Sequence, residues 1–284
     1  MEHFIEILSH TFLDTVKMLP FLFGVYLLIE FLEHKASDAL PNALRRLGPF
    51  GPVGGAFLGC LPQCGFSVAA SNLYSGRLIS LGTLLAVYIA TSDEAIPIML
   101  ANPDCISDVW KLIVAKIIIA VIAGLFVDAL VRFFKRKSNE EAEPYVDLCE
   151  SCGCEHHGVF LSALKHTLQI FAFLFVIALA LEALMHFAGE ELLGKLLMQD
   201  SVFQPMLAAL IGLIPNCAPS VILTDLYVAG NLSFGSIVAG LSTGAGLGLV
   251  VLFKVNRNFR QNIAIVSALY LIGAVSGMLI DLVF

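Results

Sequence analysis

Long apolar stretches separated by short polar ones set the pattern of this chain. A helix rises 1.5 Å per residue, so about 20 apolar residues cross a hydrocarbon core of ~30 Å. Six stretches of roughly this length predict membrane-crossing helices, at 11–34, 80–100, 109–134, 166–187, 235–252 and 262–282. Two further apolar stretches, 51–75 and 205–227, are each interrupted near their middle by a proline and polar residues.

The two interrupted stretches are copies of one another. At a shift of 153 residues, Ala56–Ala86 aligns without a gap on Ala209–Ala239, with 11 identities in 31 positions. Shared apolar composition would match leucines and alanines, whereas these copies match Pro, Cys, Tyr and Gly in register. The sequence therefore predicts a duplicated fold, with Leu61–Gly65 and Ile214–Ala218 at corresponding places.

Composition places the chain in a bilayer. It is 58% hydrophobic and 14% charged, with a mean hydropathy of +0.88. Soluble domains carry about 25% charged residues. We therefore expect an integral membrane protein whose principal partner is lipid, and the net charge of −7 argues against nucleic acid as a partner.

The distribution of basic residues discriminates between a crossing and a re-entrant topology for the interrupted stretches, because loops rich in Lys and Arg stay cytoplasmic. If 51–75 crosses the membrane, the basic residues of the first half divide between both faces. If it enters and leaves on one side, all eight lie on the same face: Lys35, Arg45, Arg46, Arg77, Arg132, Lys135, Arg136 and Lys137. The second half then adds Lys254, Arg257 and Arg260 to that face, and the charge distribution favours re-entrant hairpins.

The predicted fold class follows from this count. Each half would have three crossings and one re-entrant broken-helix hairpin, and an odd number of crossings inverts the second half. We expect an all-α membrane protein with repeat 1 at 1–134, a linker at 135–160 and repeat 2 at 161–284. A kinked crossing helix in place of each hairpin is the alternative topology.

The two hairpin tips are the first candidate site. Pro62 and Pro215 remove amide donors and leave free carbonyls beside Gln63, Cys64, Asn216 and Cys217. Irregular backbone at membrane depth is tolerated where it is buried in protein or lines a cavity. These groups would form a small polar pocket with two thiols, the alternative being a plain kink with the cysteines packed as small hydrophobes.

Acidic residues within an apolar stretch give the second candidate site. Asp93 and Glu94 are costly at membrane depth, where acids usually serve ions or protons. Thr91 and Ser92 before them and Pro97 after them predict a discontinuous helix. The second repeat has Gly246 and Leu247 at the acidic positions, so the acids are additions to the symmetric frame.

The acidic residues have an alternative interpretation, and a further acidic residue is a weaker candidate. The first helix segment could end near Thr91 and leave the acids at the surface. Asp225, which aligns with Asn72 near the outer end of its hairpin arm, is a weaker candidate for transport or coupling.

The linker carries the third candidate site. Three thiols and two imidazoles within nine residues can ligate one transition or heavy-metal ion, in the manner of structural zinc loops. They are Cys149, Cys152, Cys154, His156 and His157. On the charge argument the linker is cytoplasmic, where thiols stay reduced. The alternative is a disordered linker with incidental cysteines.

These motifs resemble the ten-transmembrane heavy-metal exporter family, whose members are described as manganese transporters or arsenic efflux proteins. The resemblance rests on the two proline-interrupted segments, on Thr91–Pro97 and on the Cys/His-rich linker, and it covers nearly the whole chain. It implies a metal or metalloid exporter, and six crossings plus four hairpin arms agree with ten segments. Thiols suit soft metals or trivalent arsenic, whereas carboxylates and amides suit Mn²⁺, so the ion stays open.

We therefore expect a secondary transporter in the cell membrane, not an enzyme, that exports a metal ion in exchange for protons. No phosphate-binding loop is present for ATP hydrolysis, and no cofactor is expected beyond a metal on the linker. Two alternatives are an arsenite, organoarsenical or other small-anion permease, and more remotely a membrane thiol redox enzyme. Oligomeric state is not readable from the sequence, and a homo-oligomer stays open.

Overall fold

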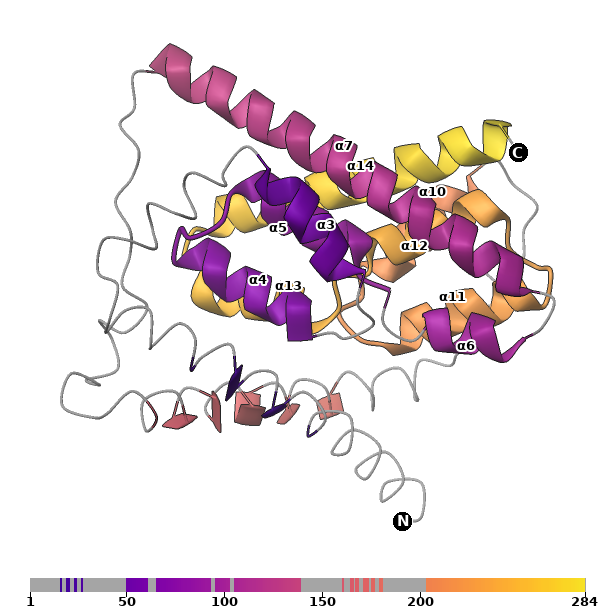
Figure 1. Ribbon diagram of the computed structural model, residues 1–284, viewed down its shortest axis with the longest axis horizontal. Coiled ribbons are helices and arrows are strands. Elements are labelled where there is room, and N and C mark those ends of the chain that lie inside the picture. The colour runs from indigo at the N-terminus through magenta and orange to yellow at the C-terminus, as the bar shows by residue number, and fades with distance from the viewer. Residues whose placement is uncertain are drawn as a thin grey trace.

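Figure 1 shows the computed structural model. The structure describes residues 50–60, 65–92, 95–102, 105–138 and 203–283, together with single positions between 16 and 27 and between 160 and 180. Two predicted crossings, 11–34 and 166–187, and the whole Cys/His-rich linker therefore lie outside these ranges, apart from the single positions.

Helices make up the described ranges, which contain no strand, so the all-α expectation is confirmed for this part of the chain. The first half contains α3 (Gly51–Gly59), α4 (Gly65–Ser75), α5 (Leu81–Ala90), α6 (Ala95–Ala101) and α7 (Ile106–Ser138). The second half contains α10 (Gln204–Gly212), α11 (Ala218–Val228), α12 (Phe234–Thr243), α13 (Leu247–Val255) and α14 (Phe259–Val283).

The helix bounds repeat at the shift predicted from the sequence. Adding 153 to the bounds of α3, α4 and α5 gives the bounds of α10, α11 and α12. The start of α7 moves onto the start of α14 in the same way, although the aligned sequence segment ends well before either helix. The duplication therefore extends beyond the residues that reveal it in the sequence.

Four described stretches are long and apolar enough to cross a membrane. They are Leu81–Ala101, Ile106–Phe134, Phe234–Val255 and Phe259–Val283. The first and third, which are the two broken helices, are 69% and 83% buried, whereas α7 and α14 are only 33% and 28% buried. The broken helices therefore form the interior, and α7 and α14 form the surface.

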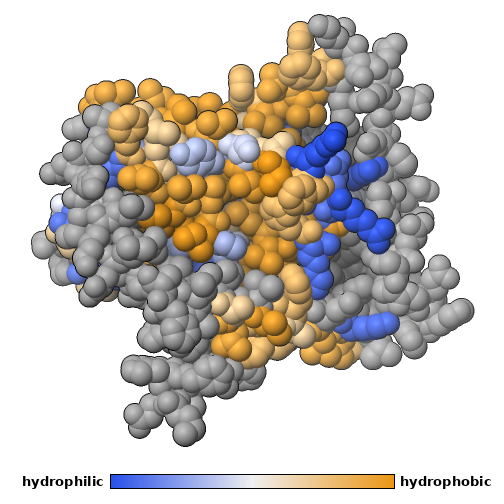
Figure 2. All heavy atoms as spheres, turned by 180° about the vertical axis from the view of Figure 1, so that it is seen from behind, coloured by the Kyte–Doolittle hydropathy of each residue, from blue (hydrophilic) through white to orange (hydrophobic). Residues whose placement is uncertain are grey.

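The exposed side chains of α7 and α14 are apolar, as a bilayer requires. Large exposed residues follow one face of α7 (Trp110, Ile118, Ile122, Phe126) and of α14 (Leu271, Val275, Leu279). Figure 2, which views the molecule from behind Figure 1, shows apolar side chains over much of that face, with a group of hydrophilic residues toward one edge. In water such a surface would aggregate, whereas lipid solvates it.

Small residues let the interior and surface helices approach closely. The α5–α7 crossing is at Gly82 and Gly124, and the α12–α14 crossing is at the equivalent Gly235 and Gly277. A Cβ at Gly124 would come 2.7 Å from the Gly82 carbonyl oxygen, closer than real Cβ atoms approach. Close packing of this kind drives helix association in membranes, where the hydrophobic effect is absent.

An aspartate fixes each of these crossings in the same way. Asp128 of α7 accepts hydrogen bonds from the Ser80 hydroxyl at 2.6 Å and the Gly82 amide at 2.8 Å. Asp281 of α14 accepts from the corresponding serine hydroxyl at 2.6 Å and glycine amide at 2.7 Å. Each carboxylate therefore binds the N-terminal end of a broken helix, where amide groups lack helical partners.

The two halves exchange their shorter helices. The helix after the first interruption, α4 of repeat 1, packs on α13 of repeat 2, and the corresponding helix of repeat 2, α11, packs on α6 of repeat 1. Figure 1 shows the first pair at one end of the molecule and the second pair at the other. The core around α5 and α12 thus lies between two arms that belong to different repeats.

Candidate functional site

The first helix break is buried. Between α5 and α6, Thr91 leaves the helical conformation with a ψ of 130°, and Thr91 and Ser92 are 2% and 4% exposed. The predicted discontinuous helix is therefore confirmed, and these two residues do not lie at a surface. Asp93 and Glu94, which follow them directly, lie outside the described residues.

Lys116 of α7 reaches this break from the side. Its side chain is fully buried, and its ammonium donates to the Thr91 carbonyl oxygen and to the Ser92 hydroxyl, the latter at 2.6 Å. A buried ammonium is expensive and persists only where oxygen acceptors replace water. The cation therefore joins α7 to the point where the first broken helix opens.

The second helix break supplies a further acceptor. The Lys116 ammonium also donates to the Leu241 carbonyl oxygen at 2.8 Å, three residues before Gly244, where α12 ends. The backbone then turns through Gly246, whose φ of 52° suits glycine, and α13 begins at Leu247. Both breaks thus contribute oxygens to one buried cation, one break from each repeat.

Ser242 follows Leu241 near the end of α12. It is fully buried, and its Oγ has no hydrogen-bond partner within the described part of the chain. An unpaired buried hydroxyl costs about 1–3 kcal/mol, so such groups are rare outside functional sites. The hydroxyl is chemically available to a ligand.

The hairpin tips border this region. Asn216 and Cys217 are half-buried, and the Asn216 side chain accepts the Cys217 amide at 2.7 Å, so it caps the turn itself. One turn later, Ser220 Oγ lies 3.7 Å from the point that a Cβ atom would occupy at Gly244, at the second break. In the first repeat, Cys60 precedes the predicted tip and is a half-buried free thiol. Gln63 and Cys64 are outside the described residues.

Asp225 does not join this site, because it is exposed on α11, about 10 Å along the helix from its start. The described residues contain no group of three or more metal-ligating side chains, and the linker ligands Cys149–His157 are not among them. Cys64 also lies outside the described residues, so the prediction that it lies near Cys217 stays a prediction.

The importance of Lys116 was missed at the sequence level because of a helix boundary. The sequence predicts the third crossing from Val109, which puts Lys116 one to two turns from its start. The helix begins at Ile106, so Lys116 is ten residues, or roughly 15 Å, along it. A second signal was available: the position 153 residues later is Leu269, so the lysine belongs to one repeat only.

A model of the family described as "Putative, 10TM heavy-metal exporter" matches residues 1–190 and 168–284, which together span the chain. The chain belongs to this family. Comparisons with curated proteins and with solved structures give no match. The described part of this exporter-family chain contains four apolar stretches long enough to cross a membrane and four shorter helices, α3, α4, α10 and α11, with two predicted crossings outside it.

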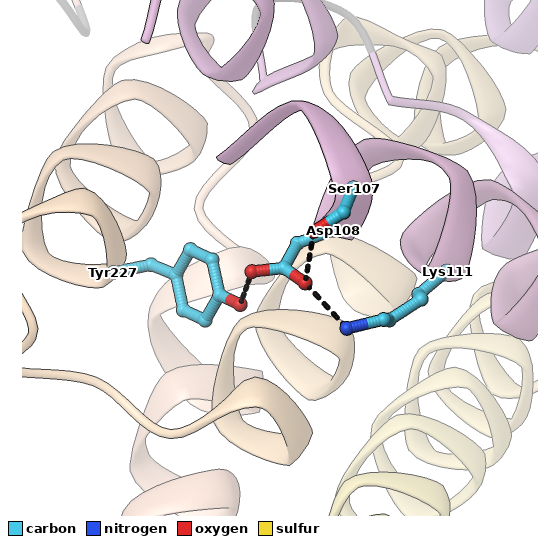
Figure 3. Close-up of polar contacts among 4 residues, drawn as sticks. All are labelled: Ser107, Asp108, Lys111 and Tyr227. Carbon is cyan, nitrogen blue, oxygen red and sulfur yellow. Dashed lines mark hydrogen bonds and ion pairs between the residues drawn. The ribbon is translucent and has the colours of Figure 1, made fainter. Parts of the chain in front are cut away.

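A second polar cluster of this exporter-family chain lies where α7 begins (Figure 3). The Asp108 carboxylate accepts from the Tyr227 hydroxyl at 2.8 Å, from the exposed Lys111 at 2.8 Å and from Ser107 at 3.4 Å. The equivalent place in the other repeat joins Gln261 to the Tyr74 hydroxyl at 2.6 Å. Each tyrosine ends the second arm of one hairpin and bonds the surface helix of the other repeat.

Proposed function

We propose that this chain is a secondary active transporter that exports a transition or heavy-metal cation from the cytosol in exchange for protons. The observation that carries the proposal is the buried polar site at the two helix breaks, in a chain of the heavy-metal exporter family. Broken helices that meet in a membrane interior provide carbonyl oxygens to ions. Asp93 and Glu94 follow Ser92 directly and would carry metal and protons in alternation.

The proposed topology is an inverted repeat with re-entrant hairpins. The arms α3, α4, α10 and α11 have only 9 to 11 residues, which is about half the length needed to cross. With three crossings in each repeat, the hairpins enter from opposite faces. The basic residues then gather on one face, which puts the linker in the cytosol and the protein in the cell membrane.

The linker would collect the exported ion. Cys149, Cys152, Cys154, His156 and His157 offer more ligands than one tetrahedral ion requires. Soft metals would bind these thiolates most tightly, whereas Mn²⁺ would rely on the carboxylates of the membrane site. Comparing several ions under one assay therefore separates the two ligand sets.

Transport by the purified full chain in liposomes tests the proposal. Mn²⁺, Zn²⁺, Co²⁺, Cd²⁺ and arsenite are offered separately, with and without an imposed proton gradient. We expect gradient-dependent movement of at least one metal cation, and its loss in Asp93→Asn and Glu94→Gln. Equal reconstitution and thermal melting of each variant are the control. Full transport by both variants would contradict the coupling role, and absence of any gradient effect would contradict proton exchange.

Lys116 is the observation that favours a second candidate, a small-anion permease. A buried ammonium attracts an oxyanion, and helix N-termini at the breaks would add amide donors. Against this, the ammonium already donates to three oxygens of the protein, so its donors point at the two breaks. The liposome assay separates the candidates, because an anion permease would move arsenite and none of the divalent cations.

A further inference from the structure

The groups around the Lys116 ammonium have the composition of a cation site. Its three identified acceptors are oxygens: the Thr91 carbonyl, the Ser92 hydroxyl at 2.6 Å and the Leu241 carbonyl at 2.8 Å. Carbonyl and hydroxyl oxygens replace the hydration shell of metal cations in the same way. We call these three oxygens the oxygen cage.

The helix breaks free the two carbonyls of the cage. Thr91 is the C-cap residue of α5, and Leu241 lies in the final turn of α12. Carbonyls at the end of a helix lack a hydrogen bond from the amide four residues ahead. The amide of Ala245, which would bond the Leu241 carbonyl in a continuous helix, bonds the Thr243 carbonyl instead. The breaks therefore aim main-chain oxygens from both repeats at a single point.

The folded frame does not require a lysine here. Leu269 holds the corresponding position on α14, is fully buried, and packs in the apolar core. The two repeats otherwise share helix bounds, glycine crossings and aspartate contacts, so a leucine satisfies the same packing position. The ammonium is an addition to one repeat, in the same half as Asp93 and Glu94.

Ser242 follows Leu241 in the chain, and its buried hydroxyl has no partner among the described residues, but its Cβ lies toward Gly273 of α14. The cage is therefore defined by the three oxygens that accept from the ammonium. A hard divalent cation prefers six or more oxygen ligands, so a metal ion in the cage would take further ligands beside these three.

We propose that the oxygen cage is a cation site on the transport pathway, occupied in this structure by the Lys116 ammonium and by the exported metal ion after the ammonium is displaced. This proposal rests on the proposed export function and names its ligands. Exchange of an internal cation for a transported one keeps the buried site charged in both states, which avoids leaving bare oxygens or an uncompensated ion in a low-dielectric interior. Lys116 then limits metal affinity by competing for the same oxygens.

Removal of the internal cation tests the idea on the purified full chain. Lys116→Leu keeps an apolar stem, copies the residue of the other repeat, and leaves the place of the ammonium vacant. Lys111→Leu is the matched control, because it removes an exposed ammonium from the same helix. Thermal melting is measured in ammonium chloride, MnCl₂ and CdCl₂ against N-methylglucamine chloride at equal ionic strength, and metal affinity is measured by equilibrium binding.

We expect free ammonium and at least one metal ion to raise the melting temperature of Lys116→Leu, and neither cation to do so to the same extent in the control. The metal should also bind Lys116→Leu about tenfold more tightly than the wild type, because binding no longer includes displacement. Lys116→Ala serves as a second variant if the leucine variant does not fold. Equal or weaker metal binding, with no stabilisation by ammonium, would overturn the proposal.

The result separates this inference from the export function. If Lys116→Leu binds metal more tightly but the wild type transports no metal in liposomes, the export function is contradicted and the cation site is supported. Transport by the wild type without any cation effect on the variants would do the reverse.

Discussion

The two aspartate contacts allow one perturbation to be made twice within a single chain. Asp128→Asn and Asp281→Asn each replace a carboxylate that accepts one serine hydroxyl and one glycine amide at the start of a broken helix. Asparagine keeps the volume of the side chain. It loses the charge and presents an amide NH₂ to at least one of the two donors.

The magnitude follows from the number of bonds. Hydrogen bonds to charged groups contribute about 1.5–3 kcal/mol each in soluble proteins, but side-chain bonds within membrane bundles average only about 0.6 kcal/mol. Two bonds per aspartate give about 1 kcal/mol on the membrane scale and about 3–6 kcal/mol on the soluble scale, and we expect each substitution to destabilise the protein by an intermediate amount of about 2–4 kcal/mol. The bond lengths agree within 0.1 Å between the repeats, so the two costs should match within about 1 kcal/mol.

Unfolding in mixed micelles with increasing SDS, followed by circular dichroism, measures both costs on one scale. Asp225→Asn is the control, because this substitution removes the same charge from a carboxylate that is exposed on α11. A cost below about 0.5 kcal/mol at both aspartates, which is the scale of a neutral surface change, would refute their role in fixing the helix crossings. A large cost at one and none at the other would refute the structural equivalence of the repeats.

Three further predictions concern packing, the hairpin arm and the linker. Gly212→Ala should destabilise the protein by about 1–3 kcal/mol in the same SDS titration, because its Cβ would meet the Gly240 carbonyl, whereas Gly54→Ala meets nothing and should be neutral. Tyr227→Phe should cost about 1 kcal/mol by losing its bond to the α7 carboxylate, and an unchanged midpoint would count against that contact. Replacing the cysteines of 149–154 by serine should remove high-affinity Cd²⁺ binding measured by equilibrium dialysis, and retained binding would contradict a thiolate site.

The sequence was sufficient for the frame of the fold because its signals are local. Proline in the two interrupted stretches and the consecutive polar residues at 91–94 disfavour a continuous helix, and the structure has helix ends at these places. The repeat was recognisable because identical Pro, Gly and Tyr residues stay in register. The exchange of α4 and α11 between the repeats was not predicted, because it depends on packing between segments that are about 125 to 180 residues apart.

The site was predicted only in part, and for a physical reason. Ser92 was recognised from its acidic neighbours, and the structure places it in the buried site. Lys116 was not selected, because a lysine near a helix end normally extends to the head groups. Its depth depends on three extra residues at the start of α7, and element boundaries are the least certain feature of a sequence reading. The aspartates were overlooked because their partners are 46 and 48 residues away.

The exchanged hairpin arms also bear on how the chain is made. Ser71 of α4 lies 2.7 Å from the Gly248 carbonyl oxygen of α13, a partner synthesised 177 residues later. Chains emerge from the ribosome N-terminus first, so the first repeat enters the membrane before the Gly248 acceptor of Ser71 and the α13 face that covers α4 have been made. Neither half can reach its final packing alone, and assembly of the first repeat ends only when nearly the whole protein has been translated.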